Sequence, residues 1–522
     1  MKGQSLPHTF SANTAAKASE VNENFTYLLE RFGTRKTTVN CYSGESITTA
    51  LHNYNHIIIN GVCTENISLD GETLPHRVVI LEGSSSASDG ITAASSASPV
   101  IDINYHVFVR VKNLTLKGGQ MGLKVRRNGI ALISNSIVEN NSGHGICACG
   151  TSFMLSESNT IRNNSGNGIK ATDNAEVSIK SNTISGHSGG NSIQITQGAF
   201  ANIESNTITG SSGQNAVEIS RGGSATIKSN TIQSAYNGIT VQDSSHAFLK
   251  NNTVNNNSAN GLVVENNASV ILAEGNTFSN NSQHGIALWL GGSLNMWCDA
   301  QLTSATTISS NTKGAIQVSD ASKAELCNLS LSSPKNGIQA GMGAYLNIRN
   351  ITITNSQGDG ISLWGAKGQI DNATITGSSN AGIRLNNGFL EIYNSTISGN
   401  TINGIASHQQ SAINLGGGVI IENNGYGIGM HNSTLFQYDN ESTSYIRNNT
   451  GKEISATMSS IGFNNVTVGG TSGGTEINLS QGSILRIETG TSITGSIWCD
   501  GSLNTGKFID DSITLNPTNS GC

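Results

Sequence analysis

The sequence predicts an all-β protein, a right-handed parallel β-helix (solenoid) with an N-terminal amphipathic helix, on three observations. A Gly-Ile dipeptide or a close variant returns every 22 to 24 residues within each of two long runs. Short stretches of alternating apolar and polar residues follow it, and Gly-, Asn- and Ser-rich turns separate these stretches. A fixed period of this kind is typical of a solenoid built from β-strands. The dipeptides begin at residues 122, 145, 168, 192, 216, 238, 261 and 285, and then at 315, 337, 360, 382, 404 and 427.

Each repeat holds three short strands. In the coil around Gly168, Ile169 and Ala171 alternate with polar residues, Val177 and Ile179 do the same, and Ile184 opens a third stretch. Alternation puts one set of side chains inside and the other outside. Three strands fit one turn of a parallel β-helix, with roughly sixteen coils stacked about 4.8 Å apart. An antiparallel sandwich is excluded, because it needs hairpin turns at roughly 8–12-residue spacing. We expect one solenoid over residues 38–500, with these side chains buried in one stack: Ile169, Ile193, Ile239, Ile361 and Ile405.

Asparagine gives a second periodic signal. Stacked amides can hydrogen-bond from coil to coil and satisfy backbone groups at a bend, so we expect a buried Asn ladder. Several of these residues stand in Asn-x-Ser/Thr sequons, but the ladder is favoured over glycosylation. The second set lies one residue further from the apolar position, which predicts a turn lengthened by one residue across 287–315. The first set is Asn135, Asn159, Asn182, Asn206, Asn230, Asn252 and Asn276, and the second is Asn328, Asn350, Asn372 and Asn394.

The chain resembles the right-handed parallel β-helix repeat proteins of the pectin-lyase-like superfamily. The resemblance rests on Asn-Gly-Ile strands at 167–169, 336–338 and 403–405 and on Ser-Asn-Thr-Ile turns at 181–184 and 205–208. It covers roughly residues 38–500. The superfamily includes pectate and alginate lyases, polygalacturonases, epimerases, phage tailspikes and adhesins, so the resemblance implies a fold and leaves the activity open.

The two ends are expected to differ from the repeats. Val21, Phe25, Leu28 and Phe32 form the apolar stripe of an amphipathic helix over residues 15–32, within an N-terminal arm of residues 1–37. This helix either caps the open end of the solenoid or assembles subunits, as in a homotrimer. A short helix is expected over 46–54. Residues 501–522 form a C-terminal coil end tied by a cysteine.

Eight cysteines indicate an oxidising compartment. Cys147 and Cys149 stand on one strand, where a bridge across a single residue would be strained. Structural or free thiols are favoured there, and a metal site with His144 is the alternative. The other six are expected to form three disulfides: Cys41–Cys63, Cys298–Cys327 and Cys499–Cys522.

Composition and charge exclude several classes of protein. A net charge of −6 argues against nucleic acid as a partner. No stretch approaches the roughly 18 apolar residues of a membrane span. Met1–Phe10 lacks the apolar core of a signal peptide, so the protein is expected at the cell surface or outside the cell with its signal removed, or as a phage component.

Function must come from outward positions, of which two follow each Gly-Ile. Among them, Trp289 and Trp364 are three coils apart, about 14 Å by strand spacing. Exposed aromatic rings suit the face of a sugar, and polar side chains between them can bond hydroxyls. The alternative is that each Trp packs beneath a loop. The predicted carbohydrate-binding residues are Trp289, Gln317, Gln339, Trp364, Arg384 and Asn386.

A catalytic role is a weaker expectation. Arg384 could neutralise a sugar carboxylate, and His408 or His431 could abstract the adjacent proton, as β-elimination requires. A glycosidase needs paired carboxylates, and the strip offers only Glu218 and Glu265. The leading hypothesis is therefore a β-helix of adhesin or tailspike type that binds polysaccharide, without metal or cofactor. The alternatives are a polysaccharide lyase (which could use Ca²⁺) or hydrolase acting on acidic glycan, and a structural fibre.

Overall fold

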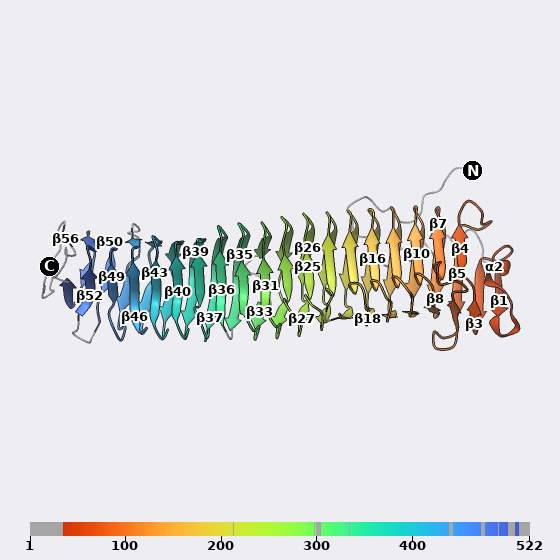
Figure 1. Cartoon of the computed structure of the whole chain (residues 1–522), viewed down its shortest axis with the longest axis horizontal. Coiled ribbons are helices and arrows are strands. Elements are labelled where there is room, and N and C mark those ends of the chain that lie inside the picture. The colour runs from red at the N-terminus through yellow and green to blue at the C-terminus, as the bar shows by residue number, and fades with distance from the viewer. Residues whose placement is uncertain are drawn as a thin grey trace. The chain divides into compact units, whose positions relative to one another are not determined.

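The computed structural model describes residues 35–211, 213–296, 298, 304–332, 335–437, 442–470, 475–488, 490–499 and 507–510. Its contacts divide the chain into two compact units. Unit 1 comprises Met1–Ala259 and Asn267–Val270, and unit 2 comprises Asn260–Asn266 and Ile271–Cys522. Each unit is a stack of parallel coils (Figure 1). The all-β parallel solenoid is therefore confirmed, while the expected domain boundaries at residues 38 and 500 stay predictions.

Unit 1 shows the coil in its simplest form. One coil consists of β16 (Ile169–Thr172), β17 (Glu176–Lys180) and β18 (Thr183–Ser185). Each strand pairs in parallel with its counterpart one coil later, so that Ile169 lies beside Ile193 and Val177 beside Ala201. Within each unit, the strands that follow the Gly-Ile positions form a sheet, here called the first sheet. In unit 1 they are β4 (Ile67–Asp70), β7 (Ile101–Asn104), β10 (Leu123–Arg126), β13 (Ile146–Cys149), β16, β19 (Ile193–Thr196), β22 (Val217–Ser220) and β25 (Ile239–Val241).

Unit 2 repeats the same coil with longer strands on its other faces. In β35 (Lys323–Ser332), β37 (Tyr345–Thr354) and β39 (Lys367–Thr376), two strands of the simple coil run together. More first-sheet strands occur than the sequence predicted, because coils outside the two Gly-Ile runs also contribute. In unit 2 they are β28 (Leu262–Val264), β31 (His284–Leu288), β34 (Gly314–Val318), β36 (Asn336–Gly341), β38 (Ile361–Trp364), β40 (Ala381–Asn386), β43 (Asn403–His408), β46 (Tyr426–His431), β49 (Ile454–Thr457), β52 (Thr475–Ser480) and β55 (Ser496–Cys499).

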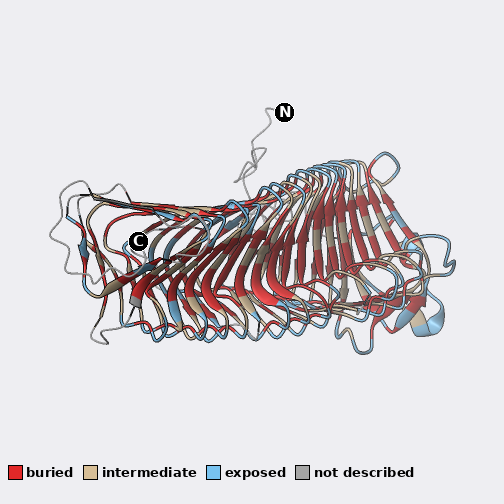
Figure 2. Cartoon of the chain, turned by 60° about the vertical axis from the view of Figure 1, so that its left-hand side comes forward, coloured by how far each residue is buried: buried red, intermediate tan, exposed pale blue. Residues whose placement is uncertain are grey.

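The core of each unit lies inside the coils, where alternate strand residues are buried (Figure 2). The predicted register is confirmed, since Ile169, Ile193 and Ile239 in unit 1 and Ile361 and Ile405 in unit 2 are all 0% exposed. Because neighbouring coils are in register, an outward residue on one coil lies beside the outward residues of the next. The outer face is therefore organised in columns of side chains.

The Asn ladder exists, but its expected membership was partly wrong. In unit 1 the amides of Asn159, Asn182, Asn206 and Asn230 are buried and bonded coil to coil, each accepting from the backbone N–H of the previous coil. Asn135 is exposed, and Ser136 takes the ladder position beside Asn159.

The second set of asparagines does not reflect a lengthened turn, because these residues occupy the bend position that precedes the ladder position. Asn328, Asn350, Asn372 and Asn394 adopt left-handed conformations with φ between 45° and 53°, as Asn135 does. Asn350, Asn372 and Asn394 are exposed on the bend. The residue after Asn350, Ile351, takes the inward position and is buried.

The expected short helix is present as α2 (Ile47–Ala50), shorter than predicted, with Ser46 Oγ accepting from Thr49 N–H. Disulfides Cys41–Cys63 and Cys298–Cys327 are confirmed. The amphipathic helix expected over 15–32 and Cys522 lie outside the described residues, as does part of the segment 287–315 between the two Gly-Ile runs.

Candidate functional site

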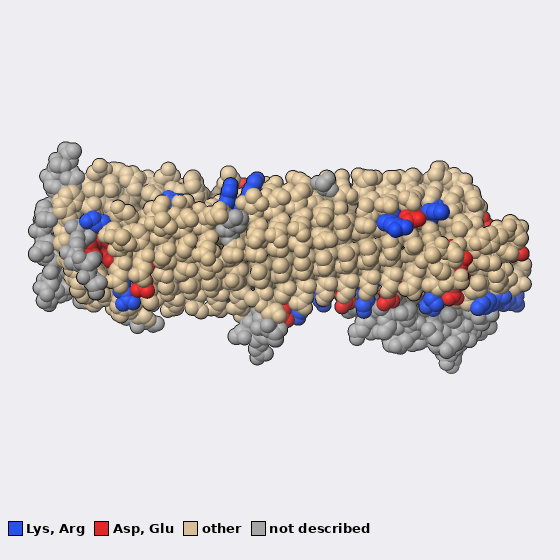
Figure 3. Space-filling model, turned by 90° about the horizontal axis from the view of Figure 1, so that it is seen from below, with Lys and Arg blue, Asp and Glu red and all other residues tan. Residues whose placement is uncertain are grey.

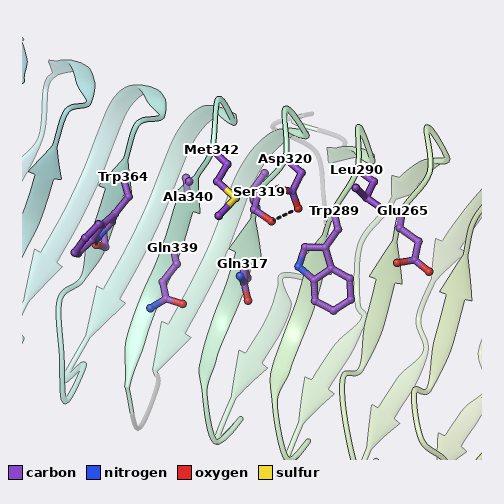
Figure 4. A pocket seen from close by; sticks show the side chains of 13 residues that line it. Glu265, Trp289, Leu290, Gln317, Ser319, Asp320, Gln339, Ala340, Met342 and Trp364 are labelled. Carbon is purple, nitrogen blue, oxygen red and sulfur yellow. Dashed lines mark hydrogen bonds between the residues drawn. The ribbon is translucent and has the colours of Figure 1, made fainter.

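The four central residues of the predicted strip line one groove in unit 2. Trp289 follows β31, Gln317 stands on β34, Gln339 on β36 and Trp364 at the end of β38. The groove has a volume of about 700 Å³. Figure 4 shows the two glutamines between the two indole rings. The volume lies within the range of roughly 300–1,000 Å³ typical of ligand sites.

The groove exists because small residues stand between the two tryptophans. The column that contains Trp289 continues through Ser319 and Gly341 to Trp364, which pairs with Gly341. A serine and a glycine leave the space between the rings open, and the neighbouring column places Gln317 beside Gln339. Spacing of about 4.8 Å per coil puts the two Trp backbones about 14 Å apart.

The two indoles differ in how they are held. Trp364 is 59% exposed, and its Nε1–H donates to Ser362 Oγ at 2.8 Å. That bond fixes the polar edge of the ring and leaves its apolar surface accessible. Trp289 is half-buried at the other end of the groove. Neither ring is fully covered, so the alternative in which each Trp is buried under a loop is not what the structure shows.

Apolar residues at the turns form the rim of the groove. Leu290 and Met342 adopt left-handed conformations, with φ of 48° and 50°, and are 54% and 74% exposed. A large side chain in this conformation costs about 1–2 kcal/mol, and its exposure gains nothing for folding. Exposed apolar residues that cluster around a concave site are typical of a binding surface.

The charges that line the groove are negative. Glu265 and Asp320 are among its lining residues, and Asp320 Oδ2 accepts from Ser319 Oγ at 3.0 Å (Figure 4). None of the described lining residues is Lys or Arg. Elsewhere on the surface, acidic and basic side chains often lie next to each other (Figure 3), for example in the pairs Arg162–Glu139 and Arg447–Glu422.

Arg384 and Asn386 lie on β40, one coil beyond the groove, beside Ser362 and Trp364. Arg384 Nε donates to Asp359 Oδ2 at 2.9 Å. Asp359 is 6% exposed, and its other carboxylate oxygen accepts from Ala381 N–H. The guanidinium is thus already paired with a carboxylate of the protein. Sequence reasoning missed Asp359, because it stands in the turn before β38 and not at an outward strand position.

The two candidate histidines continue the Trp364 column. His408 pairs in register with Asn386 on one side and with His431 on the other. Burial lowers the pKa of His408, and the nearby charges of Arg384 and His431 lower it further. His408 is therefore neutral at neutral pH and able to accept a proton. Neither histidine lines the groove.

The two predicted thiols are not free. Cys147 and Cys149 form a disulfide across a single residue, so the favoured expectation of unbridged cysteines was wrong. His144 instead accepts from the backbone N–H of Asn167 through Nδ1. Among the described residues there is no group of three or more His, Cys, Asp or Glu side chains that could hold a metal. No described helix is long and apolar enough to cross a membrane.

Several solved structures match the chain at low identity and low TM-score. The bacteriophage Phi29 gene product 12 N-terminal fragment is 12% identical, with a TM-score of 0.38 over 89% of this chain and 92% of that one. A double mutant of the periplasmic alginate epimerase AlgG is 12% identical, with a TM-score of 0.35 over 69% and 78%. The PL6 family alginate lyase AlyGC is 11% identical, with a TM-score of 0.29 over 93% and 99%. These scores are too low to carry an argument about function.

No curated protein matches the chain. A family model does match, described as the right-handed beta helix region, over residues 99–208, 150–297 and 292–451. These matches cover more than half of the sequence, and the parallel coils, buried Ile stack and in-register columns agree with them. The chain therefore belongs to the family of right-handed β-helix proteins.

Proposed function

We propose that this protein binds polysaccharide along the groove of unit 2, as a secreted or surface-exposed β-helix of adhesin or tailspike type. One observation carries the proposal: two accessible indole rings stand at the ends of a groove that Ser319 and Gly341 leave open. Aromatic rings pack on the apolar faces of sugars, and the amides of Gln317 and Gln339 can exchange hydrogen bonds with hydroxyl groups. Three disulfides among the described residues support an oxidising location.

The preferred glycan is uncharged. A polysaccharide that carries carboxylates would meet Glu265 and Asp320 in the groove, and like charges in a partly enclosed site repel. Arg384, expected to hold an acidic sugar, is instead engaged by Asp359. Arg384 and Asn386 thus extend the site by one coil, where Asn386 offers an amide and Arg384 positions the strand.

Affinity electrophoresis through gels that contain a neutral or an acidic polysaccharide tests the proposal. The variant that lacks both rings, Trp289→Ala with Trp364→Ala, should lose the retardation caused by neutral glycan. Each aromatic contact is worth about 1 kcal/mol. Trp498→Ala is the matched control, because Trp498 is an exposed indole on β55 and does not line the groove. Equal retardation of the double variant and the control would reject the groove as the binding site.

The second candidate function is a polysaccharide lyase or hydrolase acting on acidic glycan. The observation that favours a lyase is the lowered pKa of His408, which leaves it neutral on the coil next to Asn386. Incubation with acidic and neutral glycans, followed by ultraviolet absorbance for unsaturated ends and by a reducing-end assay, tests both activities. Turnover that disappears in His408→Ala while binding persists would establish the lyase. The third alternative, a structural fibre assembled through residues 15–32, would appear as a stable oligomer in sedimentation.

A further inference from the structure

Unit 1 carries an apolar patch on the outside of its coils. It lies on β5 (Val78–Gly83), β8 (Phe108–Lys112), β11 (Ile130–Ser134) and β14 (Phe153–Glu157), four strands that pair in sequence. The inward residues of these strands include Val79, Val109 and Met154, all 0% exposed. The intervening positions face outward, and most of them at this place are apolar too, although Arg110 stands between Ile80 and Leu132. The outer patch consists of Val78, Ile80, Phe108, Ile130, Leu132, Phe153 and Leu155.

The outer patch is covered. Ile80, Phe108, Leu132 and Leu155 are between 2% and 9% exposed, although they point away from the coil interior. Neighbours on a flat sheet shield the sides of a side chain but leave its tip open, so such burial requires a second layer over the sheet. Phe389, at an outward position of β41 (Phe389–Tyr393) in unit 2, shows the uncovered case with 36% exposure.

The chain itself supplies a matching apolar stripe just before these strands. The spacing of Val21, Phe25, Leu28 and Phe32 would place all four on one face of a helix. From Val21 to Phe32 such a helix rises about 16 Å at 1.5 Å per residue. Four strands at 4.8 Å spacing extend about 14 Å between the first and the last. The stripe and the outer patch therefore agree in length as well as in polarity.

The connection to the sheet also fits. The segment before β1 (Lys36–Asn40) ends at Arg35, whose N–H donates to Asn55 Oδ1. β1 pairs with β2 (His56–Asn60), and β2 pairs with β5, where His56 lies beside Ile80. The outer patch thus begins two strands, or about 10 Å, from the point where the segment joins the sheet. Residues 33–35 can bridge about 10 Å when extended.

We propose that residues 21–32 dock along the outer patch, with Val21, Phe25, Leu28 and Phe32 facing the sheet as an intramolecular second layer. This placement differs from a cap over the open end of the solenoid and from a helix that joins subunits. In both of those arrangements the apolar stripe would lie elsewhere, and the outer patch would need another cover. The proposal is independent of the glycan groove, which lies in unit 2.

Photo-crosslinking of the full-length protein tests the placement. A benzophenone amino acid at position 25 should give crosslinks within one chain, to peptides that contain residues 108–112, 130–134 or 153–157. The matched control carries the same group at position 23, on the opposite face of the predicted helix, and should give at least several-fold fewer of these crosslinks. Crosslinks between two chains would replace the proposal with subunit assembly. Crosslinks to α2 or β1, or equal yields at both positions, would also overturn it.

A solution measurement gives a second readout. Phe25→Asp with Leu28→Asp should uncover the outer patch, and the binding of a hydrophobic dye such as anilinonaphthalene sulfonate should rise several-fold. Circular dichroism should retain the β signal, because the coil interior is unchanged. Glu23→Gln with Glu30→Gln is the control and should leave dye binding unchanged. Unchanged dye binding in the Phe25/Leu28 variant would reject the proposal.

Discussion

Arg384 and Asp359 form an ion pair of 2.9 Å between adjacent coils of unit 2, with the carboxylate buried. The pair ties the turn before β38 to the outward face of β40. It also engages the guanidinium of Arg384, which stands beside the groove, with a carboxylate of the protein itself. The chemistry of the site thus depends on a residue that does not belong to the outward strip.

We expect Asp359→Asn to change the choice of glycan. The amide keeps the acceptor for Ala381 N–H but no longer neutralises the guanidinium, which becomes available for a sugar carboxylate. Retention by acidic polysaccharide should increase, while retention by neutral polysaccharide stays the same. Arg384→Ala should have no such gain and should lower stability by about 1–2 kcal/mol, since it leaves a buried carboxylate without its partner. Affinity electrophoresis and urea unfolding measure the two effects.

Filling the groove should abolish binding without unfolding the protein. A Cβ at Gly341 would meet the O and Cβ of Trp364 at 3.5 and 4.0 Å, which are ordinary contact distances. Gly341→Leu therefore places a branched side chain between the two indoles at little backbone cost. We expect at least a tenfold loss of glycan retention, compared with none for Gly213→Leu, where a Cβ meets nothing within 4 Å. Normal binding by Gly341→Leu would show that the ligand does not enter between the rings.

Two buried histidines should make the protein sensitive to acid. Burial lowers the pKa of His187 and of His284 from 6.5 to about 4. The unfolded chain binds protons at these sites below pH 6.5 and the folded chain does not, so stability is fully present above pH 6.5 and falls as the pH drops toward 4. Each site contributes roughly 3 kcal/mol across this window.

The matched test uses His187→Asn and His246→Asn. His187 Nδ1 accepts from Asn164 N–H, a bond that an Asn oxygen can also accept, as Asn164 Oδ1 does from Asn141 N–H one coil earlier. We expect His187→Asn to flatten the decline of the unfolding free energy between pH 6.5 and 4. His246→Asn, at an exposed position, is the matched control for the change from His to Asn. If the unfolding free energy changed with pH identically in the wild-type protein and in both variants, His187 would not be a source of the acid sensitivity.

Glu476, on β52, should change the stability of the protein with pH in the direction opposite to that of the two histidines. Burial raises its pKa, and the charge of Glu453 on the preceding coil raises it further. A raised carboxyl pKa means that stability is present at low pH and is lost as the pH rises above about 4.5. Glu476→Gln should therefore stabilise the protein at pH 7.5, by about 1 kcal/mol, and have less effect at pH 5. Urea unfolding at the two pH values measures the difference, and a variant less stable at pH 7.5 would contradict it.

The Asn ladder of unit 1 should be sensitive to the loss of a single amide. Asn206 Oδ1 accepts from both Asn182 N–H and the Asn182 amide, and Asn206 Nδ2 donates to Ile179 O. Asn206→Leu leaves these buried groups unpaired, at a cost of roughly 3 kcal/mol or more. Asn350→Leu, on an exposed bend, should cost only about 1–2 kcal/mol, because its left-handed φ disfavours a large side chain. Thermal unfolding compares the two, and equal losses would show that the ladder does not stabilise the fold.

The sequence predicted the coil register because burial acts on every repeat alike. Ile169 and Ile405 follow the same spacing rule, and a strand shifted by one residue would expose its whole apolar set. It also predicted Trp289, Gln317, Gln339 and Trp364 as neighbours, since register alone places them. The sequence did not predict Asp359 and Met342 as site residues because they stand in turns. Turns lack the apolar–polar alternation that tells which side chains of a strand point outward. The sequence did not predict the disulfide Cys147–Cys149, because a bridge across a single residue is expected to be strained, yet the two cysteines are bonded.

The columns of side chains have a consequence for how such a protein can change. Interior residues decide whether a coil stacks, whereas Ser319 and Gly341 decide only what fits between two rings. A substitution at either position changes which ligand fits the groove and leaves the buried residues that hold the coils together unchanged. New ligand preferences can therefore arise one residue at a time on an architecture that selection holds constant. The coil spacing of about 4.8 Å then sets the distances between the side chains that contact each new ligand.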